Sequence, residues 1–132
     1  MPTEAEARSA LPPRGFIRQY VEEATRITTS PTIFQLGAAL GTLSVTCPLD
    51  YGMLYAGSYL RANLYVLTVG PSGDGQKSTA VKLAQGLLDR AAPGLKGDEP
   101  ATREGLVDSL RHQPVQAIFY EELGTLIAQT KQ

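Results

Sequence analysis

The sequence has one cysteine, one histidine and a net charge close to zero. The single cysteine, Cys47, excludes a disulfide bond within the chain. The single histidine, His112, has no cysteine or carboxylate near it at the spacing of metal ligands, so we expect an ordinary residue at a helix C-terminus. The 12 basic and 13 acidic residues nearly balance, which is unlike the strongly basic composition of many nucleic-acid-binding domains.

Long apolar segments are lacking as well. The most apolar stretch, residues 32–46, carries no charge but is diluted by glycine, glutamine, serine and threonine, which favours a buried helix over a membrane span. The first residues are polar and acidic, which is unlike a signal peptide. We therefore expect a cytoplasmic protein without a membrane partner.

The most informative stretch is a glycine-rich turn between an apolar run and a helix. Residues 63–69 are rich in β-branched and aliphatic side chains and predict a strand, and an apolar period typical of a helix follows the turn. Backbone N–H groups in such a turn can surround phosphates, and the helix N-terminus adds unpaired donors. We expect nucleotide-binding residues throughout this turn: Gly70, Ser72, Gly73, Asp74, Gly75, Gln76, Lys77, Ser78 and Thr79.

Two side chains in this turn predict catalytic chemistry. Lys77 is expected to reach the terminal phosphates of ATP, and the Ser78 hydroxyl to bind Mg²⁺. The common motif places glycine directly before the lysine, whereas Gln76 separates Gly75 from Lys77 here. Either the loop accommodates one more residue and keeps its function, or Lys77 is displaced and the site is degenerate.

A second motif follows the other strongly apolar run. Residues 115–120 predict a strand, and Glu121 and Glu122 come directly after it. The carboxyl ends of parallel strands meet at one edge of a sheet, so the carboxylates and the glycine-rich turn would converge there. We expect Glu121 to help hold Mg²⁺ and Glu122 to polarise the attacking water. The alternative is an acidic first turn of the last helix.

The N-terminal part of the chain predicts two helices after a short lead-in. Residues 1–13 have no apolar period and are expected to be a disordered or loosely attached lead-in. Residues 14–28 have the period of an amphipathic helix. A second helix, 32–46, is expected to start with Ser30 as N-cap and to be buried nearly all round. Its Gly37 and Gly41 would allow close helix packing.

Tyrosines and glycines in residues 48–61 predict short strands or a hairpin. Further helices are expected to open at Lys77 and run to Ala91, ended by Pro93, and to cover 103–112, with Thr102 as N-cap. The apolar positions expected to face inward on the last helix are Leu106, Val107 and Leu110.

Together these elements predict an α/β protein with a partial parallel sheet of the P-loop NTPase type, preceded by an N-terminal helical pair. The expected divisions are a lead-in (1–13), the helical pair (14–47), and a P-loop NTPase core (48–132) truncated after the strand that delivers the carboxylates.

Three segments resemble the N-terminal part of a poorly characterised family of P-loop ATPases found in phages, plasmids and other mobile elements, often linked to primase or helicase functions. They are residues 63–73, 101–106 and 118–124, and the resemblance spans roughly residues 14–132. The resemblance implies that phosphates are bound by Gly70, Gly73, Gly75 and Lys77. It also implies that Ser78 contacts Mg²⁺, and that Glu121 and Glu122 handle the metal and the attacking water.

The sequence departs from the family pattern at two places. Some family members resemble this chain in placing a residue such as Gln76 before the lysine. The first acidic position, Glu121 here, is more usually aspartate in the family. A sensor residue and an arginine finger would be expected beyond Gln132.

We therefore expect an ATP-binding and ATP-hydrolysing module of a helicase-like or primase-like replication protein from a phage or mobile element. Its partners would be a nucleoside triphosphate with Mg²⁺, a second copy of the chain, and single-stranded DNA through partner domains. One alternative is a non-catalytic nucleotide-binding or structural fragment. Another is a P-loop small-molecule kinase, which the scattered basic residues disfavour.

Overall fold

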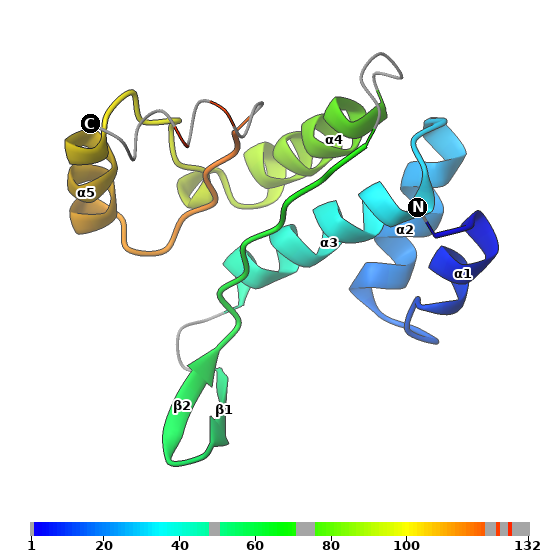
Figure 1. Ribbon diagram of the computed structural model, residues 1–132, viewed down its shortest axis with the longest axis horizontal. Helices are drawn as coiled ribbons and strands as arrows, with labels where there is room; N and C mark the ends of the chain where they lie inside the picture. The colour runs from blue at the N-terminus through cyan, green and yellow to red at the C-terminus, as the bar shows by residue number, and fades with distance from the viewer. Residues whose placement is uncertain (1, 48–50, 71–75, 121–123, 125–126, 128–132) are drawn as a thin grey trace.

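The computed structural model describes residues 2–47, 51–70, 76–120, 124 and 127. Its elements follow the chain from the N-terminal helix to a helix at the opposite end of the molecule (Figure 1). In order they are α1 (Glu4–Ser9), α2 (Phe16–Ile27), α3 (Thr32–Thr46), β1 (Gly52–Tyr55), β2 (Ser58–Arg61), α4 (Gln76–Ala91), the 3₁₀ turn η1 (Pro93–Leu95) and α5 (Arg103–His112).

Helix α3 is the centre of the fold, because α1, α2 and α4 all pack against it. None of its residues before Thr46 is exposed, which confirms the prediction of a buried helix over 32–46. The helices expected over 14–28, 77–91 and 103–112 are confirmed as well. No helix in the described part of the chain is both long enough and apolar enough to cross a membrane.

Most of the core consists of small and medium-sized side chains at helix–helix contacts. Small residues let the helix axes approach each other closely, and each buried side chain then contacts several neighbours. The buried apolar residues are Ala7, Val21, Ala24, Phe34, Ala39, Val45, Ala80, Ala84 and Leu88.

The expectation of disorder over 1–13 is wrong for the segment that forms α1. Thr3 and Glu6 form a capping box, in which the Thr3 side chain accepts from the Glu6 N–H and Glu6 accepts from the Thr3 N–H at 2.7 Å. Glu4 accepts hydrogen bonds from the Thr32 hydroxyl and, at 3.2 Å, from the Thr32 backbone N–H. The local cap starts the helix, and the Glu4 carboxylate fastens it to α3.

The N-cap of α3 also differs from the expectation. Pro31, not Ser30, is the N-cap residue, and it has no side chain that could accept a hydrogen bond. Glu4 takes over this capping role from a distant part of the sequence. Ser30 does not cap α3, and its hydroxyl instead donates to the Gln76 carbonyl at 2.7 Å.

We expect Glu4→Gln to lower the free energy of unfolding by about 1 kcal/mol at neutral pH, as for the loss of a helix cap. The hydrogen bond from the Thr32 side chain lowers the pKa of Glu4. The contribution of Glu4 is therefore fully present above its ordinary pKa of 4.5 and is lost as the pH falls through the lowered value. Urea unfolding at about pH 7 and about pH 3 measures this difference, which should shrink in acid.

The control for this variant is Glu22→Gln. Glu22 is an exposed residue of α2 whose carboxylate pairs with Arg18, also on α2. Exposed ion pairs contribute little to stability, so this control should change it by a few tenths of a kcal/mol. A Glu4→Gln effect of equal size at both pH values would contradict the proposed cap.

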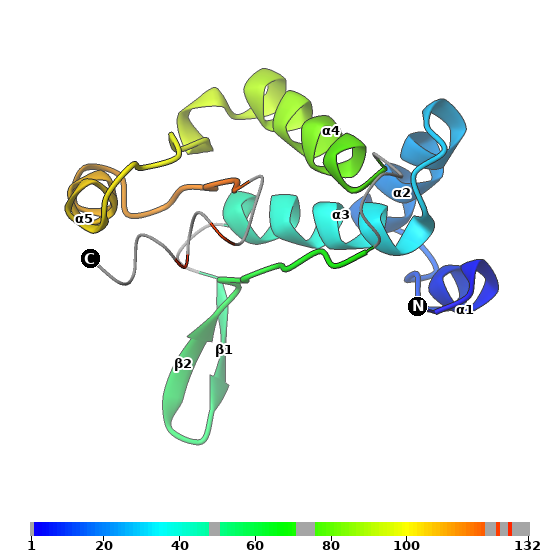
Figure 2. The same cartoon turned by 45° about the horizontal axis from the view of Figure 1, so that its top comes forward.

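The predicted parallel sheet of the P-loop NTPase type is wrong. The sheet in the described residues is a two-stranded antiparallel hairpin, in which Met53 pairs with Leu60 and Leu54 with Tyr59. Its turn residues, Ala56 and Gly57, have φ values of 48° and 80°, in the left-handed region that two-residue hairpin turns favour. The hairpin projects from the helical body (Figure 2) and confirms the expectation for residues 48–61 over its described strands.

Residues 63–69, expected to be a strand, pack along helix α3 instead. This segment runs along α3 (Figure 2), and Ser44 of α3 accepts from the Leu64 N–H at 3.0 Å and donates to the Ala62 carbonyl. A Cβ atom at Gly37 would lie 3.3 Å from Val66, so the glycines of α3 accommodate this segment and not another helix. The apolar run thus packs on a helix, with much of its surface exposed.

The second expected strand, 115–120, is reduced to one parallel bridge between Ala117 and Lys96. Gly97 donates to the Ala117 carbonyl at 2.9 Å, and Ala117 donates to the Leu95 carbonyl at 2.7 Å. Its partner is therefore the segment after α4, not residues 63–69. The inward orientation expected for α5 is also wrong at two positions, because Val107 and Leu110 are exposed.

Candidate phosphate site at the start of helix α4

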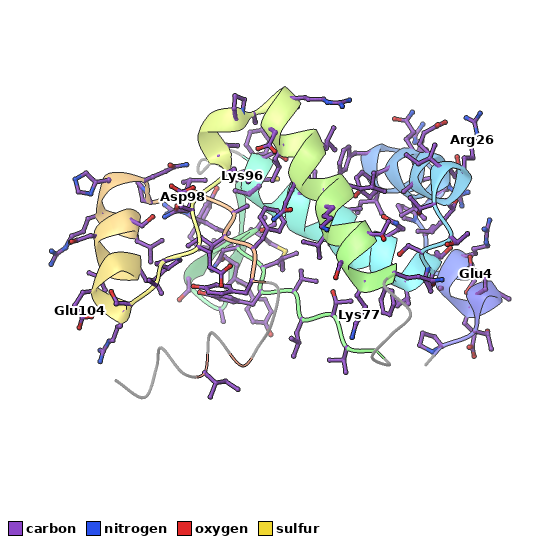
Figure 3. All side chains as sticks on the ribbon, turned by 90° about the horizontal axis from the view of Figure 1, so that it is seen from above. Glu4, Arg26, Lys77, Lys96, Asp98 and Glu104 are labelled. Atoms are coloured by element: carbon purple, nitrogen blue, oxygen red, sulfur yellow. The ribbon has the colours of Figure 1, made fainter. Side chains whose placement is uncertain are left out.

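The residues on either side of the glycine-rich segment 71–75 are in contact. The described part of the extended segment reaches Gly70, α4 is described from Gln76, and the Lys77 ammonium donates to the Gly70 carbonyl at 2.7 Å. Figure 3 shows Lys77 at the first turn of α4, beside the extended segment. A positive charge is thereby placed at the entrance to the turn.

Close packing explains why position 70 is a glycine. A Cβ atom there would lie 2.9 Å from Phe34 Cζ and 3.3 Å from Lys77 Cδ. Phe34 is buried on α3, so its ring has little room to move. Gly70 lets the backbone reach both α3 and the stem of Lys77.

The electrostatics at the start of α4 favour an anion. The first N–H groups of an α-helix have no partner within the helix, and the helix dipole is positive at this end. The first turn of α4 contains no acidic residue and carries Lys77. The exposed Ser78 follows and can offer a hydroxyl.

Gln76, the residue that departs from the common motif, is the first residue of α4. Its carbonyl accepts the hydrogen bond from the buried Ser30, which lies between α2 and α3. The insertion is therefore accommodated as part of the helix. The Lys77 ammonium contacts the Gly70 carbonyl, and whether the loop keeps its function or is degenerate stays a prediction.

Several predicted site residues lie outside the described residues: Ser72, Gly73, Asp74, Gly75, Glu121 and Glu122. The convergence of the two glutamates with Lys77 stays a prediction. Within the described ranges, no group of three His, Cys, Asp or Glu side chains is placed to hold a metal ion. The Mg²⁺ assignments to Ser78 and Glu121 stay predictions too.

A recess beside this site was not anticipated from the sequence. It has a volume of about 530 Å³ and is formed by the C-terminal end of α2, the segment after it and the first turn of α4. The hydroxyl-rich run 25–29 was the available signal, but an amphipathic helix also explains those residues. The lining residues are Thr25, Arg26, Ile27, Thr28, Thr29 and Thr79.

His112 lies at the end of α5, as expected, where its Nδ1 atom is 2.8 Å from the Asp108 carbonyl. This contact is local to α5, which lies at the opposite end of the molecule from the first turn of α4 (Figure 1). His112 therefore plays no part in the candidate site.

Comparisons with protein-family models, with curated proteins and with solved structures give no match to this chain. The resemblance to mobile-element ATPases stays a prediction from the sequence.

Proposed function

We propose that this protein binds the phosphates of a nucleoside triphosphate, as its Mg²⁺ complex, at the start of α4. The observation that carries the proposal is the contact at the start of α4 between Lys77 and Gly70, the described residues on either side of the glycine-rich sequence 71–75. The proposal depends on this local arrangement and requires no parallel sheet.

Lys77 can bind phosphate without a large rearrangement. An ammonium group has three N–H donors, and the bond to the Gly70 carbonyl uses one of them. A phosphate oxygen is a stronger acceptor for a charged donor than a neutral carbonyl. Helix N–H groups and the Ser78 hydroxyl would supply further donors and an oxygen ligand for Mg²⁺.

Binding with hydrolysis and binding without it are both compatible with this arrangement. In the hydrolytic form, Mg²⁺ would neutralise phosphate charge, Glu121 would help hold it and Glu122 would orient water. Binding without turnover is the second candidate function. The sheet in the described residues is an antiparallel hairpin, so no parallel sheet there brings the two motifs together. This observation favours binding without turnover.

The test is a calorimetric titration of the protein with MgATP. We expect Lys77→Gln to weaken binding about 10- to 100-fold, because a charge-assisted hydrogen bond contributes about 1.5–3 kcal/mol. The matched control is Lys82→Gln, which removes an exposed lysine from the same helix and should leave the affinity unchanged. The proposal is wrong if the protein does not bind MgATP or if both variants weaken binding equally.

Phosphate release from the same samples separates the two forms of the proposal. Turnover that disappears in Glu122→Gln while MgATP still binds supports hydrolysis. Binding without turnover supports the non-catalytic form. Stimulation of turnover by single-stranded DNA would support a replication role.

A further inference from the structure

We infer that the recess beside α4 holds the ribose and base of the same nucleotide. This inference rests on the proposed phosphate site. Both places involve the first turn of α4: Lys77 of the phosphate site and Thr79 of the recess both lie within it. The recess has a volume of about 530 Å³ and opens widely to solvent, so a nucleoside bound there would keep one side exposed.

The recess is fixed in place relative to the phosphate site. Ser30, directly after the lining residue Thr29, is buried and donates to the Gln76 carbonyl at 2.7 Å. The start of α4 is thus tied to the wall of the recess. A ligand that spans both parts would meet groups already held in position.

Hydroxyl groups give the recess the chemistry for a sugar. The Thr25 hydroxyl donates to the Val21 carbonyl at 2.9 Å and to the Glu22 carbonyl at 3.1 Å, and its oxygen can still accept from a ligand hydroxyl. Thr29 is exposed, and a threonine hydroxyl can both donate and accept. We assign recognition of the ribose hydroxyls to these two residues.

Thr28 has a different role, because its hydroxyl is already surrounded by partners. It donates to the Ala24 carbonyl at 2.9 Å and accepts from Gln35 Nε2 at 3.3 Å and the Ser30 N–H at 3.4 Å. These bonds hold the end of α2 against α3. Thr28 therefore shapes the wall of the recess, and its substitution would disturb the fold.

The charges of the lining favour a neutral group over a second phosphate. Among the described residues that line the recess, Arg26 alone is charged, and its guanidinium is paired with Glu23 at 2.8 Å. Figure 3 shows Arg26 at the outer edge of α2, away from Lys77. Ile27 is 69% exposed and offers an apolar surface on which a planar base can pack.

The test compares MgATP with Mg²⁺-tripolyphosphate, which has the phosphates but no nucleoside. We expect the wild-type protein to bind MgATP about tenfold tighter or more. The double variant Thr25→Val/Thr29→Val should lose most of that advantage and keep its affinity for tripolyphosphate. The Ile27 δ-methyl NMR signal should shift with MgATP and stay in place with tripolyphosphate, because only the base has a ring current.

Thr46→Val is the matched control, because Thr46 makes the same kind of local bonds as Thr25. Its hydroxyl donates to the Thr42 carbonyl at 3.0 Å and to the Leu43 carbonyl at 3.1 Å, at the far end of α3. This variant should bind both ligands like the wild type. It therefore separates loss of a helix hydroxyl from loss of the recess.

The outcomes separate this inference from the proposed function. Equal affinity for the two ligands, with Lys77 still required, overturns the nucleoside recess and leaves the phosphate site standing. An advantage for MgATP that persists in the double variant, with an unmoved Ile27 signal, places the nucleoside elsewhere and also overturns the recess. Failure to bind either ligand overturns both proposals.

Discussion

Replacing Leu88 with alanine is expected to lower the free energy of unfolding by about 3 kcal/mol. Leu88 is 1% exposed and lies on the face of α4 that also carries Ala80 and Ala84, at four-residue spacing. These alanines let α4 approach α3, and Leu88 is the one large side chain among the buried residues of α4. Its neighbours are too short to fill the cavity that truncation would leave.

Urea unfolding followed by circular dichroism measures the Leu88 effect. Leu87→Ala is the control, because this adjacent leucine is only partly buried and its truncation should cost about 1 kcal/mol or less. Equal losses for the two variants would mean that α4 does not use the Leu88 face for packing.

Replacing Gly70 with valine is expected to weaken MgATP binding about 10- to 100-fold, as much as losing Lys77, and to cost about 2 kcal/mol of stability. The first added carbon would already lie 2.9 Å from Phe34 Cζ and 3.3 Å from Lys77 Cδ, and valine adds two methyl groups beyond it. Either the backbone at Gly70 moves away from α3, or Lys77 loses its place. Both adjustments break the contact between Lys77 and the Gly70 carbonyl.

Gly94→Val is the control for Gly70→Val, because a Cβ atom at Gly94 would meet no other atom within 4 Å. We expect this control to keep its affinity for MgATP in the same titration. A Gly70→Val variant that binds MgATP like the wild type would show that the Lys77–Gly70 contact is unimportant for the ligand.

The helices could be predicted because their signals are local. An apolar period of three to four residues predicts α2 and α5, and the proline-containing segments beside α3 and α4 mark their ends. The contact between Lys77 and Gly70 belongs to the same class, since the two residues are only seven positions apart. Local sequence therefore predicted the neighbourhood of these two residues.

The errors concern features that depend on distant parts of the chain. An apolar run such as 63–69 becomes a strand only beside another strand, and here it lies along α3. Helix α1 depends on Glu4 reaching Thr32, and the recess depends on Ser30 reaching Gln76. No short-range pattern reveals such pairs, so the packing of 63–69 on α3, the attachment of α1 to α3 and the recess could not be predicted. The start of α1 did have a local signal, the capping box of Thr3 and Glu6.

The packing of Phe34 against Gly70 also has an evolutionary consequence. The end of the phenylalanine ring occupies the volume that a side chain at position 70 would need. A smaller residue at position 34 would make room for alanine at position 70, although the core of α3 would lose apolar contact. We therefore expect these two positions to covary among natural relatives, with glycine at 70 accompanying an aromatic residue at 34.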